Sequence, residues 1–290
     1  MESQLQASEN NSARESLKPV IICADDYGVD PDVDLAIVEL ARQARLSATS
    51  VLVDADISEA SVRALESLDM DIGLHLNFTE VFGQLSPQSV MPLFKLIMRS
   101  HARLLPRSWV RANIERQLDR FEALFGRLPD YVDGHLHVHQ LPVIRDELID
   151  ALTRRQLPSG FWVRDTRAGA MPGWPWSERF KSWVIGHLGM PRLASLVERA
   201  QLSRNHGFFG VYDFTRAHRP FMQMLDDWLS QAEEGALIMT HPARQVVAND
   251  PIGQARVSEY EGLASDDFLK LLQSRHARLV RASQALSSLP

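Results

Sequence analysis

The sequence contains little of several features that define whole classes of protein. Its single cysteine, Cys23, excludes a disulfide framework and a zinc site built from cysteines. No apolar run approaches the ~20 residues that a transmembrane helix needs, so stable insertion into a membrane is not expected. The 31 Lys and Arg residues are outnumbered by 37 Asp and Glu residues and form no basic block, which argues against nucleic acid as a partner.

What is present is typical of a globular protein, because 45% of the 290 residues are hydrophobic and 23% are charged. Segment 1–17 is polar, lacks the apolar stretch of a signal peptide, and is predicted to be a disordered tail. Residues 18–290 contain no linker and are predicted to form one domain with a single large core. A cytoplasmic location is expected, and the composition leaves a homo-oligomer open.

Short apolar segments alternate with amphipathic ones from residue 18 onward. Strands are predicted at 20–24, 48–54, 71–78, 131–140, 160–165, 207–214 and 235–243. Helices are predicted at 30–46, 58–68, 108–126, 141–155, 177–202, 219–234 and 265–286. Asp30 and Ser58 are predicted to cap the first two helices, and Gly126 to end the third. This alternation is typical of an α/β fold with parallel strands, either a closed (β/α) barrel or an open doubly wound sheet.

Two segments interrupt the alternation and are predicted to be insertions on loops. They are 84–107 and 167–202, and the second includes the helix predicted at 177–202. Both combine proline, arginine and tryptophan or other apolar residues without a strand pattern. Such loops shape the substrate site in parallel α/β folds.

Polar side chains collect where the predicted strands end, and parallel α/β folds keep their functional groups at these carboxyl ends. In chain order these residues are Asp25, Asp26, His75, His135, His137, His139, Arg164, Asp165, Asp213 and His241. The set includes half of the 10 histidines, which a random distribution over the surface would not produce. These residues are therefore the candidates for a functional site.

The first strand ends in two adjacent carboxylates, Asp25 and Asp26, within the sequence VIICADDYG. Like charges side by side repel and are costly to bury, so a shared cation explains the pair better than structure alone. Taken by itself, a pair of this kind is more often a turn and a helix N-cap. The other strand ends decide between these two interpretations.

The histidines favour the functional interpretation. His75 alone could be a core residue bonded to a backbone carbonyl. In an extended HLHVH segment, however, His135, His137 and His139 would point to one side, and three core imidazoles would need three sets of hydrogen-bond partners. A shared metal or substrate site needs fewer assumptions. Carboxylate and imidazole without thiolate suit zinc, iron, manganese or cobalt, and magnesium less well.

Four motifs together resemble those of a known family. They are ADDYG, GLHLNFTE, DGHLHVH and HPA, and they span residues 24 to 243 in this order. The chain resembles the YdjC-like carbohydrate deacetylases, which include chitooligosaccharide deacetylases and hopanoid-associated deacetylases. The resemblance implies a distorted (β/α) barrel related to the polysaccharide deacetylases, and one divalent metal ion, Mg or Zn.

The same resemblance implies roles for five residues. Asp26, His75 and His135 match the metal ligands. Asp25 matches the catalytic base. His241 matches a late histidine that faces the metal, and an imidazole that titrates near neutral pH could protonate the departing amine. One Asp and two His leave coordination positions for water and substrate, as in a catalytic site.

The reaction implied is removal of the N-acetyl group from an amino sugar, such as a GlcNAc-containing oligosaccharide or glycan precursor. Substrate contacts are assigned to His139, Arg164 and Asp165, although a surface ion pair explains the last two equally well. Trp174 and Trp176 could stack on sugar faces, whereas the neighbouring strand residue Trp162 is expected in the core.

Two other functions stay open at this point. A metal-dependent phosphoesterase uses the same types of ligand, usually with more carboxylates and two ions. A sugar-binding protein without turnover would keep the fold, but the complete set of strand-end residues argues against it.

Overall fold

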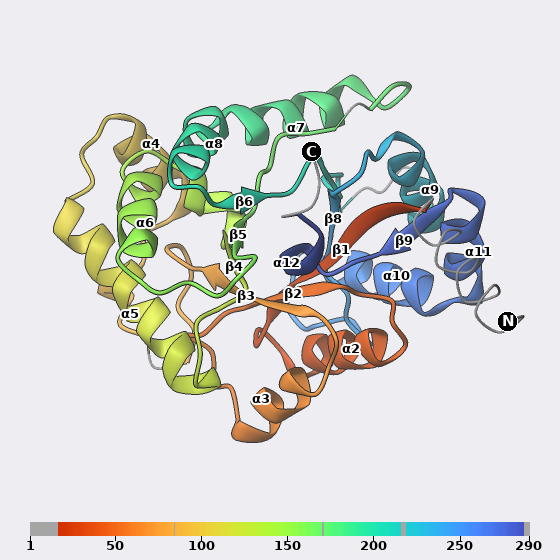
Figure 1. Ribbon diagram of the computed structural model, residues 1–290, viewed down its shortest axis with the longest axis horizontal. Helices are drawn as coiled ribbons and strands as arrows, with labels where there is room; N and C mark the ends of the chain where they lie inside the picture. The colour runs from red at the N-terminus through yellow and green to blue at the C-terminus, as the bar shows by residue number, and fades with distance from the viewer. Residues whose placement is uncertain (1–16, 84, 170, 216–218, 287–290) are drawn as a thin grey trace, which may run out of the picture.

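The computed structural model describes residues 17–83, 85–169, 171–215 and 219–286 (Figure 1). The tail predicted for 1–17 lies outside this range except for Leu17. No helix in these described ranges combines the length and the apolar character needed to cross a bilayer.

In the described residues, nine parallel strands form one curled sheet (Figure 1). They are β1 (Lys18–Tyr27), β2 (Ala48–Val51), β3 (Asp71–Leu76), β4 (Tyr131–Gly134), β5 (Trp162–Val163), β6 (Ser203–Arg204), β7 (Phe208–Phe209), β8 (Ala236–Thr240) and β9 (Ala277–Leu279). The order is β6-β5-β4-β3-β2-β1-β8-β7, and β9 pairs with the start of β1. The Gly169 N–H donates to the Phe208 carbonyl at 3.1 Å, so the chain after β5 reaches β7 at the far edge of the sheet. The α/β class and the distorted barrel are confirmed.

Helices surround the sheet (Figure 1). They are α2 (Pro31–Arg42), α3 (Glu59–Glu66), α4 (Leu93–His101), α5 (Arg107–Phe125), α6 (Ile144–Thr153), α7 (Trp176–His187), α8 (Met190–Arg199), α9 (Phe221–Gln231), α10 (Gly253–Ala264), α11 (Asp266–Ser274) and α12 (Ala282–Ala285), with short 3-10 helices η1 (Pro87–Ser89) and η2 (His135–Gln140). The predicted caps are confirmed: the side chains of Asp30 and Ser58 accept backbone N–H groups, and Gly126 ends α5 with φ of 65°.

Apolar side chains pack on both faces of the sheet because its strands are buried on both sides. On β1, Val20 and Ile22 belong to the main core between sheet and helices, whereas Ile21 and Cys23 belong to a smaller cluster inside the barrel. That inner cluster also contains Trp162, whose ring stacks on Tyr131 with centroids 4.0 Å apart. The predictions of buried Cys23 and core Trp162 are confirmed.

Three predicted elements are wrong. The helix expected at 177–202 is two helices, α7 and α8, which are separated at Leu188 and Gly189. The strand expected at 131–140 ends at Gly134, where η2 begins, and Leu136 and His137 have left-handed backbones with φ of 52° and 59°. The HLHVH imidazoles therefore do not lie on one side of a strand. The helix expected at 265–286 consists of α11, β9 and α12. Its apolar residues fit one helical stripe in the sequence, but Ala277, Arg278 and Leu279 pair with β1.

The close contact between β3 and β4 yields a stability prediction. A Cβ on Gly73 would lie 2.3 Å from the Tyr131 ring, which has no room to move because it stacks on Trp162. Gly73→Ala should lower the free energy of unfolding by about 1–3 kcal/mol, the usual cost of overpacking. Thermal unfolding checks this. As a control, Gly126→Asn should change stability little, since no atom lies within 4 Å and Asn tolerates a left-handed backbone. Equal stability of Gly73→Ala and the parent protein would contradict the prediction.

Candidate active site

The carboxyl ends of the strands meet at one end of the barrel, as expected for a parallel sheet. Ala24 of β1 pairs with Thr240 of β8 on one side and with Thr49 of β2 on the other. On the neighbouring pair of strands, His75 of β3 lies opposite Asp133 of β4. The candidate residues that follow or end these strands are thereby brought together.

An irregularity in β1 lets both of its carboxylates serve this end of the barrel. Adjacent residues of a regular strand point to opposite faces. Here the register between β1 and β2 shifts between Ala24 and Tyr27, and Asp26 has a left-handed backbone with φ of 73°. Such a backbone is uncommon outside glycine and costs on the order of 1–3 kcal/mol, so surrounding contacts must hold it.

Asp26, His75 and His135 converge on one point. Asp26 Oδ1 lies 3.4 Å from His75 Nε2 and 3.1 Å from His135 Nδ1. One ligand atom from each of the three lies within 4.8 Å of the others. Metal bonds to oxygen and nitrogen ligands are about 2.0–2.2 Å long, so a single ion among these atoms could reach all of them. This donor set of one carboxylate and two imidazoles fits a divalent metal.

Further side chains orient the two histidines. Asp133 Oδ1 lies 2.7 Å from His75 Nδ1, and Ser50 Oγ lies 3.0 Å from the same nitrogen. Glu80 Oε1 lies 3.3 Å from His135 Nε2. A carboxylate behind an imidazole is the usual support of a histidine ligand, because it sets both the tautomer and the ring orientation.

Both imidazoles attract protons strongly. Burial alone would lower the pKa of His75, but the carboxylates of Asp133, Asp26 and Asp25 raise it to about 10. Burial also opposes protonation of His135, whose pKa is nevertheless raised to about 9 by Asp26 and Glu80. A cluster that holds extra protons this firmly has a surplus of negative charge, which is what a cation site requires.

Arg164, directly after β5, is the partner of the other carboxylate of β1. Its NH1 and NH2 groups lie 2.6 Å from the two oxygens of Asp25, and NH2 also lies 2.6 Å from Asp133 Oδ2. Burial favours a neutral Asp25, but Arg164 holds the pKa of this carboxyl below its ordinary value. Cys23, Asp25 and Asp133 also lie close enough to hold an ion, but the guanidinium of Arg164 contacts all three and occupies that place.

His241 follows β8 and is held by α10, a helix that the sequence did not predict. Its backbone N–H donates to Glu259, and its carbonyl accepts from Arg256 NH1 at 3.4 Å. Arg256 NH2 also lies 2.7 Å from Asp26 Oδ2. Burial lowers the pKa of His241 to about 4, against the charges of Asp26 and Asp25, which favour protonation. The expectation of an imidazole that titrates near neutral pH is therefore wrong.

The three residues assigned to substrate contacts have partners inside the protein. His139 and Arg164 have no exposed surface, and His139 Nε2 lies 3.0 Å from the Arg164 carbonyl. Asp165 is 1% exposed and binds the side chains of Arg167 and Arg204. This burial favours support of the site over direct contact with a sugar.

Trp174 and Trp176, the two candidates for stacking on a sugar, differ in their exposure. Trp174 is 7% exposed and stacks on Trp228 with ring centroids 5.6 Å apart, so it is a core residue. Trp176 is 76% exposed.

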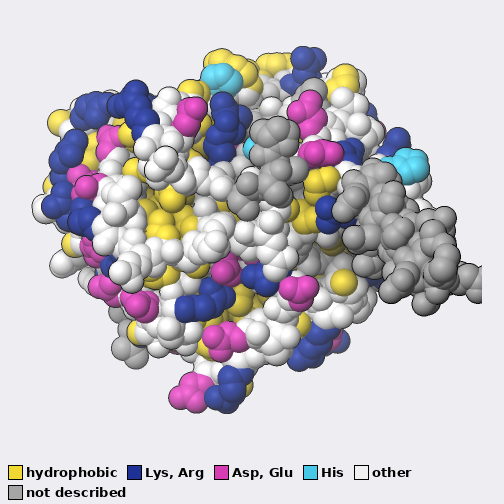
Figure 2. All heavy atoms as spheres, in the orientation of Figure 1, with side chains coloured by type: hydrophobic (Ala, Val, Ile, Leu, Met, Phe, Trp, Pro, Cys, Tyr) yellow, Lys and Arg dark blue, Asp and Glu magenta, His cyan; other side chains and the backbone are white. Residues whose placement is uncertain are grey.

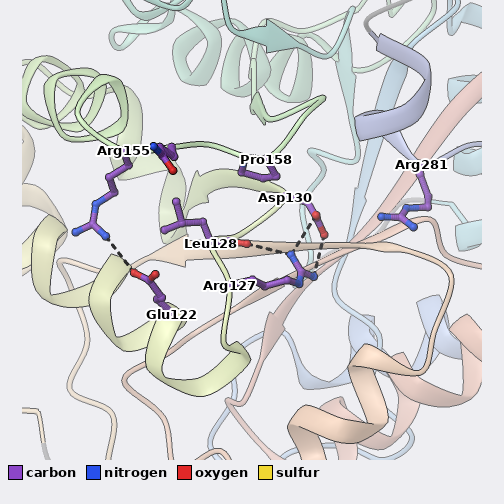
Figure 3. Close-up of a pocket in the computed structure, with 8 residues that line it drawn as sticks. Glu122, Arg127, Leu128, Asp130, Arg155, Pro158 and Arg281 are labelled. Carbon is purple, nitrogen blue, oxygen red and sulfur yellow. Dashed lines mark hydrogen bonds and ion pairs between the residues drawn. The ribbon is translucent and has the colours of Figure 1, made fainter.

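A hollow of about 710 Å³ lies at the opposite end of the barrel, beside the amino ends of β4 and β5 (Figure 3). Figure 3 shows Arg127 bound to Asp130 and Arg155 directed at Glu122. Arg281 is likewise paired, with Asp71 at 3.0 Å. The charges that line this hollow are already neutralised, and none of the candidate residues lies there.

Comparison with known proteins identifies the family. A family model described as YdjC-like protein matches residues 19–274. The chain belongs to the YdjC-like family. The resemblance drawn from the four motifs is confirmed.

Individual relatives differ in how much of the chain they match. A chitooligosaccharide deacetylase of Yersinia pestis (strain Pestoides F) is 29% identical over 274 residues, which cover 90% of this chain and 97% of that protein. A carbohydrate deacetylase of Mus musculus is 31% identical over 167 residues, which cover 53% of this chain and 51% of the mouse protein. A solved structure from Enterococcus faecalis V583, assigned to cellobiose-phosphate cleavage, has a TM-score of 0.64 and 20% identity, and covers 93% of this chain and 99% of that one. The last match shows a shared fold.

In this YdjC-like protein, sequence reasoning missed Ser50 and four charged residues that contact the site. Asp133 and Glu80 lie within the motifs DGHLHVH and GLHLNFTE, so they could have been proposed with the histidines. Arg256 and Glu259 lie on α10, after the last motif, and no local pattern in GQARVSEYEGLA marks them. They are found only from their contacts.

The basic imidazoles predict proton-coupled metal binding. With pKa values of about 10 and 9, His75 and His135 are both protonated at pH 7 in the metal-free protein, and a metal must displace these protons. Zn²⁺ binding should release about two protons, and affinity should rise by about 10–100-fold per pH unit between pH 6 and 7.5. Calorimetry in buffers of different ionisation enthalpy measures both. His101→Ala, on exposed α4, should behave like the parent protein, and binding without proton release would contradict the prediction.

Proposed function

We propose that this YdjC-like protein is a metal-dependent hydrolase that removes the N-acetyl group from an amino sugar. The observation behind this proposal is that the two carboxylates at the end of β1 have different surroundings. Asp26 faces two imidazoles, whereas Asp25 is held in its ionised form by Arg164. The relatives support the substrate class, since the Yersinia protein is named a chitooligosaccharide deacetylase and the mouse protein a carbohydrate deacetylase. The proposed substrate is a GlcNAc-containing oligosaccharide or glycan precursor.

Asp26, His75 and His135 are the proposed ligands of one divalent ion, Mg or Zn. Such an ion, when bound, polarises the acetyl carbonyl and makes water more acidic. The chain's own part is to present the ligand atoms. Asp133 accepts the Nδ1 proton of His75, which leaves Nε2 free to face the site. Arg256 binds the second oxygen of Asp26, which leaves Oδ1 for the imidazoles.

Asp25 is the proposed general base. Its carboxylate is ionised because Arg164 lowers its pKa, and the ionised form is the one that accepts a proton from water. Arg164 contacts both oxygens at 2.6 Å, so the carboxylate cannot turn away from the site. A bidentate pair of this kind fixes direction as well as charge.

His241 is the proposed donor to the departing nitrogen. Because its pKa is lowered to about 4, the imidazole is neutral in the resting protein and must gain a proton during the reaction before it gives one up. The proton that Asp25 takes from the attacking water is the one that balances this step, and it would pass to the imidazole before it reaches the departing nitrogen. The charges of Asp25 and Asp26 favour the protonated imidazole, so they stabilise this short-lived form.

The phosphoesterase alternative has less support. Two-metal phosphoesterases hold a pair of ions about 3.5–4 Å apart. Among the described residues, two groups could each hold an ion, but the guanidinium of Arg164 occupies the second of them. A single ion beside a carboxylate that does not bind it suits hydrolysis of an amide better than hydrolysis of a phosphoester.

Acetate release tests the proposed reaction. Metal-loaded protein is offered GlcNAc, chitobiose, chitotriose and a generic phosphodiester. We expect equal amounts of acetate and free amine from at least one sugar, none after treatment with a chelator, and no phosphodiester turnover. His75→Ala should lose both bound metal and acetate release, whereas His101→Ala should keep both. Stoichiometric metal in His75→Ala would make the ligand assignment wrong, and phosphodiester turnover without acetate would favour the phosphoesterase.

A second prediction separates the two adjacent carboxylates. Asp25→Asn should keep the metal but lose about 10²-fold or more of kcat, the usual scale for a general base. Elemental analysis and the acetate assay measure the two properties, and circular dichroism checks the fold. Asp69→Asn, at an exposed carboxylate on the other end of the barrel, is the matched control. Loss of metal from Asp25→Asn would instead make Asp25 a ligand, and full activity would place the base elsewhere.

A further inference from the structure

Exposed apolar side chains concentrate on the two insertions. Of the eleven large apolar side chains that are exposed in the described residues, six lie on or next to α4 and α7. They are Phe94 (77% exposed), Met98 (56%), Leu104 (61%), Trp176 (76%), Phe180 (54%) and Trp183 (54%). Figure 2 shows hydrophobic side chains along the upper edge of the molecule, over α7. Single exposed apolar residues need no explanation, but a cluster of this kind marks an interaction surface.

The aromatic residues of α7 form one outward row. Trp176, Phe180 and Trp183 are spaced by four and three residues, and their ring centroids lie 6.1 and 6.0 Å apart in succession. The other side of the helix is tied to the barrel, because Lys181 Nζ donates to the Tyr212 carbonyl at 2.9 Å and the Ile185 carbonyl accepts from the Gln140 side chain at 2.8 Å. The aromatic row is therefore held towards solvent by the fold.

Charge distinguishes these insertions from the rest of the chain. Segments 84–107 and 167–202 contain nine of the 31 Lys and Arg residues but only two of the 37 acidic ones, so they carry +7 while the remainder carries −13. On α4, Lys95 and Arg99 form no ion pair with any described residue, and Arg103 is 3.7 Å from Asp146. Figure 2 shows Lys and Arg side chains crowded along the upper left edge, in the region of α4 and α6.

Helices α4 and α7 both lie on insertions at the end of the barrel that holds the candidate site. The insertion with α4 follows β3, and that with α7 follows β5. They flank the segment after His135: Ser100 of α4 donates to the Pro142 carbonyl at 2.5 Å, and α7 binds Gln140. A surface that meets both helices would therefore lie close to the site.

We propose that the exposed faces of α4 and α7 dock this protein peripherally onto an anionic lipid bilayer. Trp and Phe side chains favour the boundary between head groups and acyl chains, and Lys and Arg beside them are attracted to anionic head groups. A second copy of this chain suits the surface less well, because a symmetric contact would place like-charged helices against each other. The docking is independent of turnover, and it would bring the proposed deacetylase site to amides displayed at the bilayer surface.

Vesicle sedimentation tests the proposal. The full chain is mixed with vesicles of phosphatidylcholine alone, or of phosphatidylcholine with about 30% phosphatidylglycerol, at low and high salt. We expect binding to the anionic vesicles that is at least about tenfold stronger and weakens with salt. The combined change Trp176→Ser, Phe180→Ser and Trp183→Ser should abolish binding, and Lys95→Glu with Arg99→Glu should remove the preference for anionic lipid. Leu269→Ser with Lys270→Glu, on exposed α11, is the matched control and should bind normally.

Four outcomes would overturn the proposal. The first three are no vesicle binding, equal binding to both vesicle types, and equal losses in the α11 control. The fourth is a change of oligomeric state in the aromatic variant, measured by light scattering, while its vesicle binding stays unchanged. That result would show that the aromatic face is a contact between copies of this chain. Release of acetate from soluble sugar should stay within about twofold in the Lys95→Glu with Arg99→Glu variant and in the α11 control, because none of these residues touches the site. Failure of docking and failure of the proposed reaction are thus told apart.

Discussion

The candidate site depends on one buried ion network, in which Arg164 bridges Asp25 and Asp133 with three contacts of 2.6 Å. A buried charge that loses its partner typically costs about 3–5 kcal/mol, so these groups hold one another in place. The network serves two tasks at once. Through Asp25 it sets the charge and direction of the proposed base, and through Asp133 it orients His75. A change at Arg164 would therefore disturb both the base and the metal ligands.

The second constraint is the left-handed backbone of Asp26, which a regular strand would not adopt. Its carboxylate is held from two sides, by the imidazoles of His75 and His135 and by Arg256 of α10. The same helix positions His241 through Glu259. The strained strand end and the late histidine thus share one support. A metal at this point would be held by residues whose geometry is already set by ion pairs and hydrogen bonds around them.

The two ends of the barrel have different physical characters. At the amino ends of the strands, α12 covers the inner core, and the arginines around the open hollow are paired with carboxylates (Figure 3). At the carboxyl ends, the insertions add positive charge and exposed aromatic rings around the candidate site. A parallel (β/α) architecture permits this separation because loops at one end of parallel strands can vary without changing the packing of the sheet. The insertions are thus the part of the chain best suited to determine where the enzyme works.

The sequence by itself determined the strand and helix alternation and the helix caps, because these follow from local patterns. The common direction of parallel strands placed the candidate carboxylates and histidines at one end of the sheet, and the family resemblance selected His75 and His135 from them as partners of Asp26. The sequence could not determine the partner of Asp25, since Arg164 lies 139 residues away and either side chain could have formed a surface pair. It also could not reveal Arg256, 230 residues from Asp26, or the left-handed turn within HLHVH. These features depend on which segments the curled sheet brings together. The tertiary structure decided these contacts, because a charged side chain needs a partner only once folding has buried it.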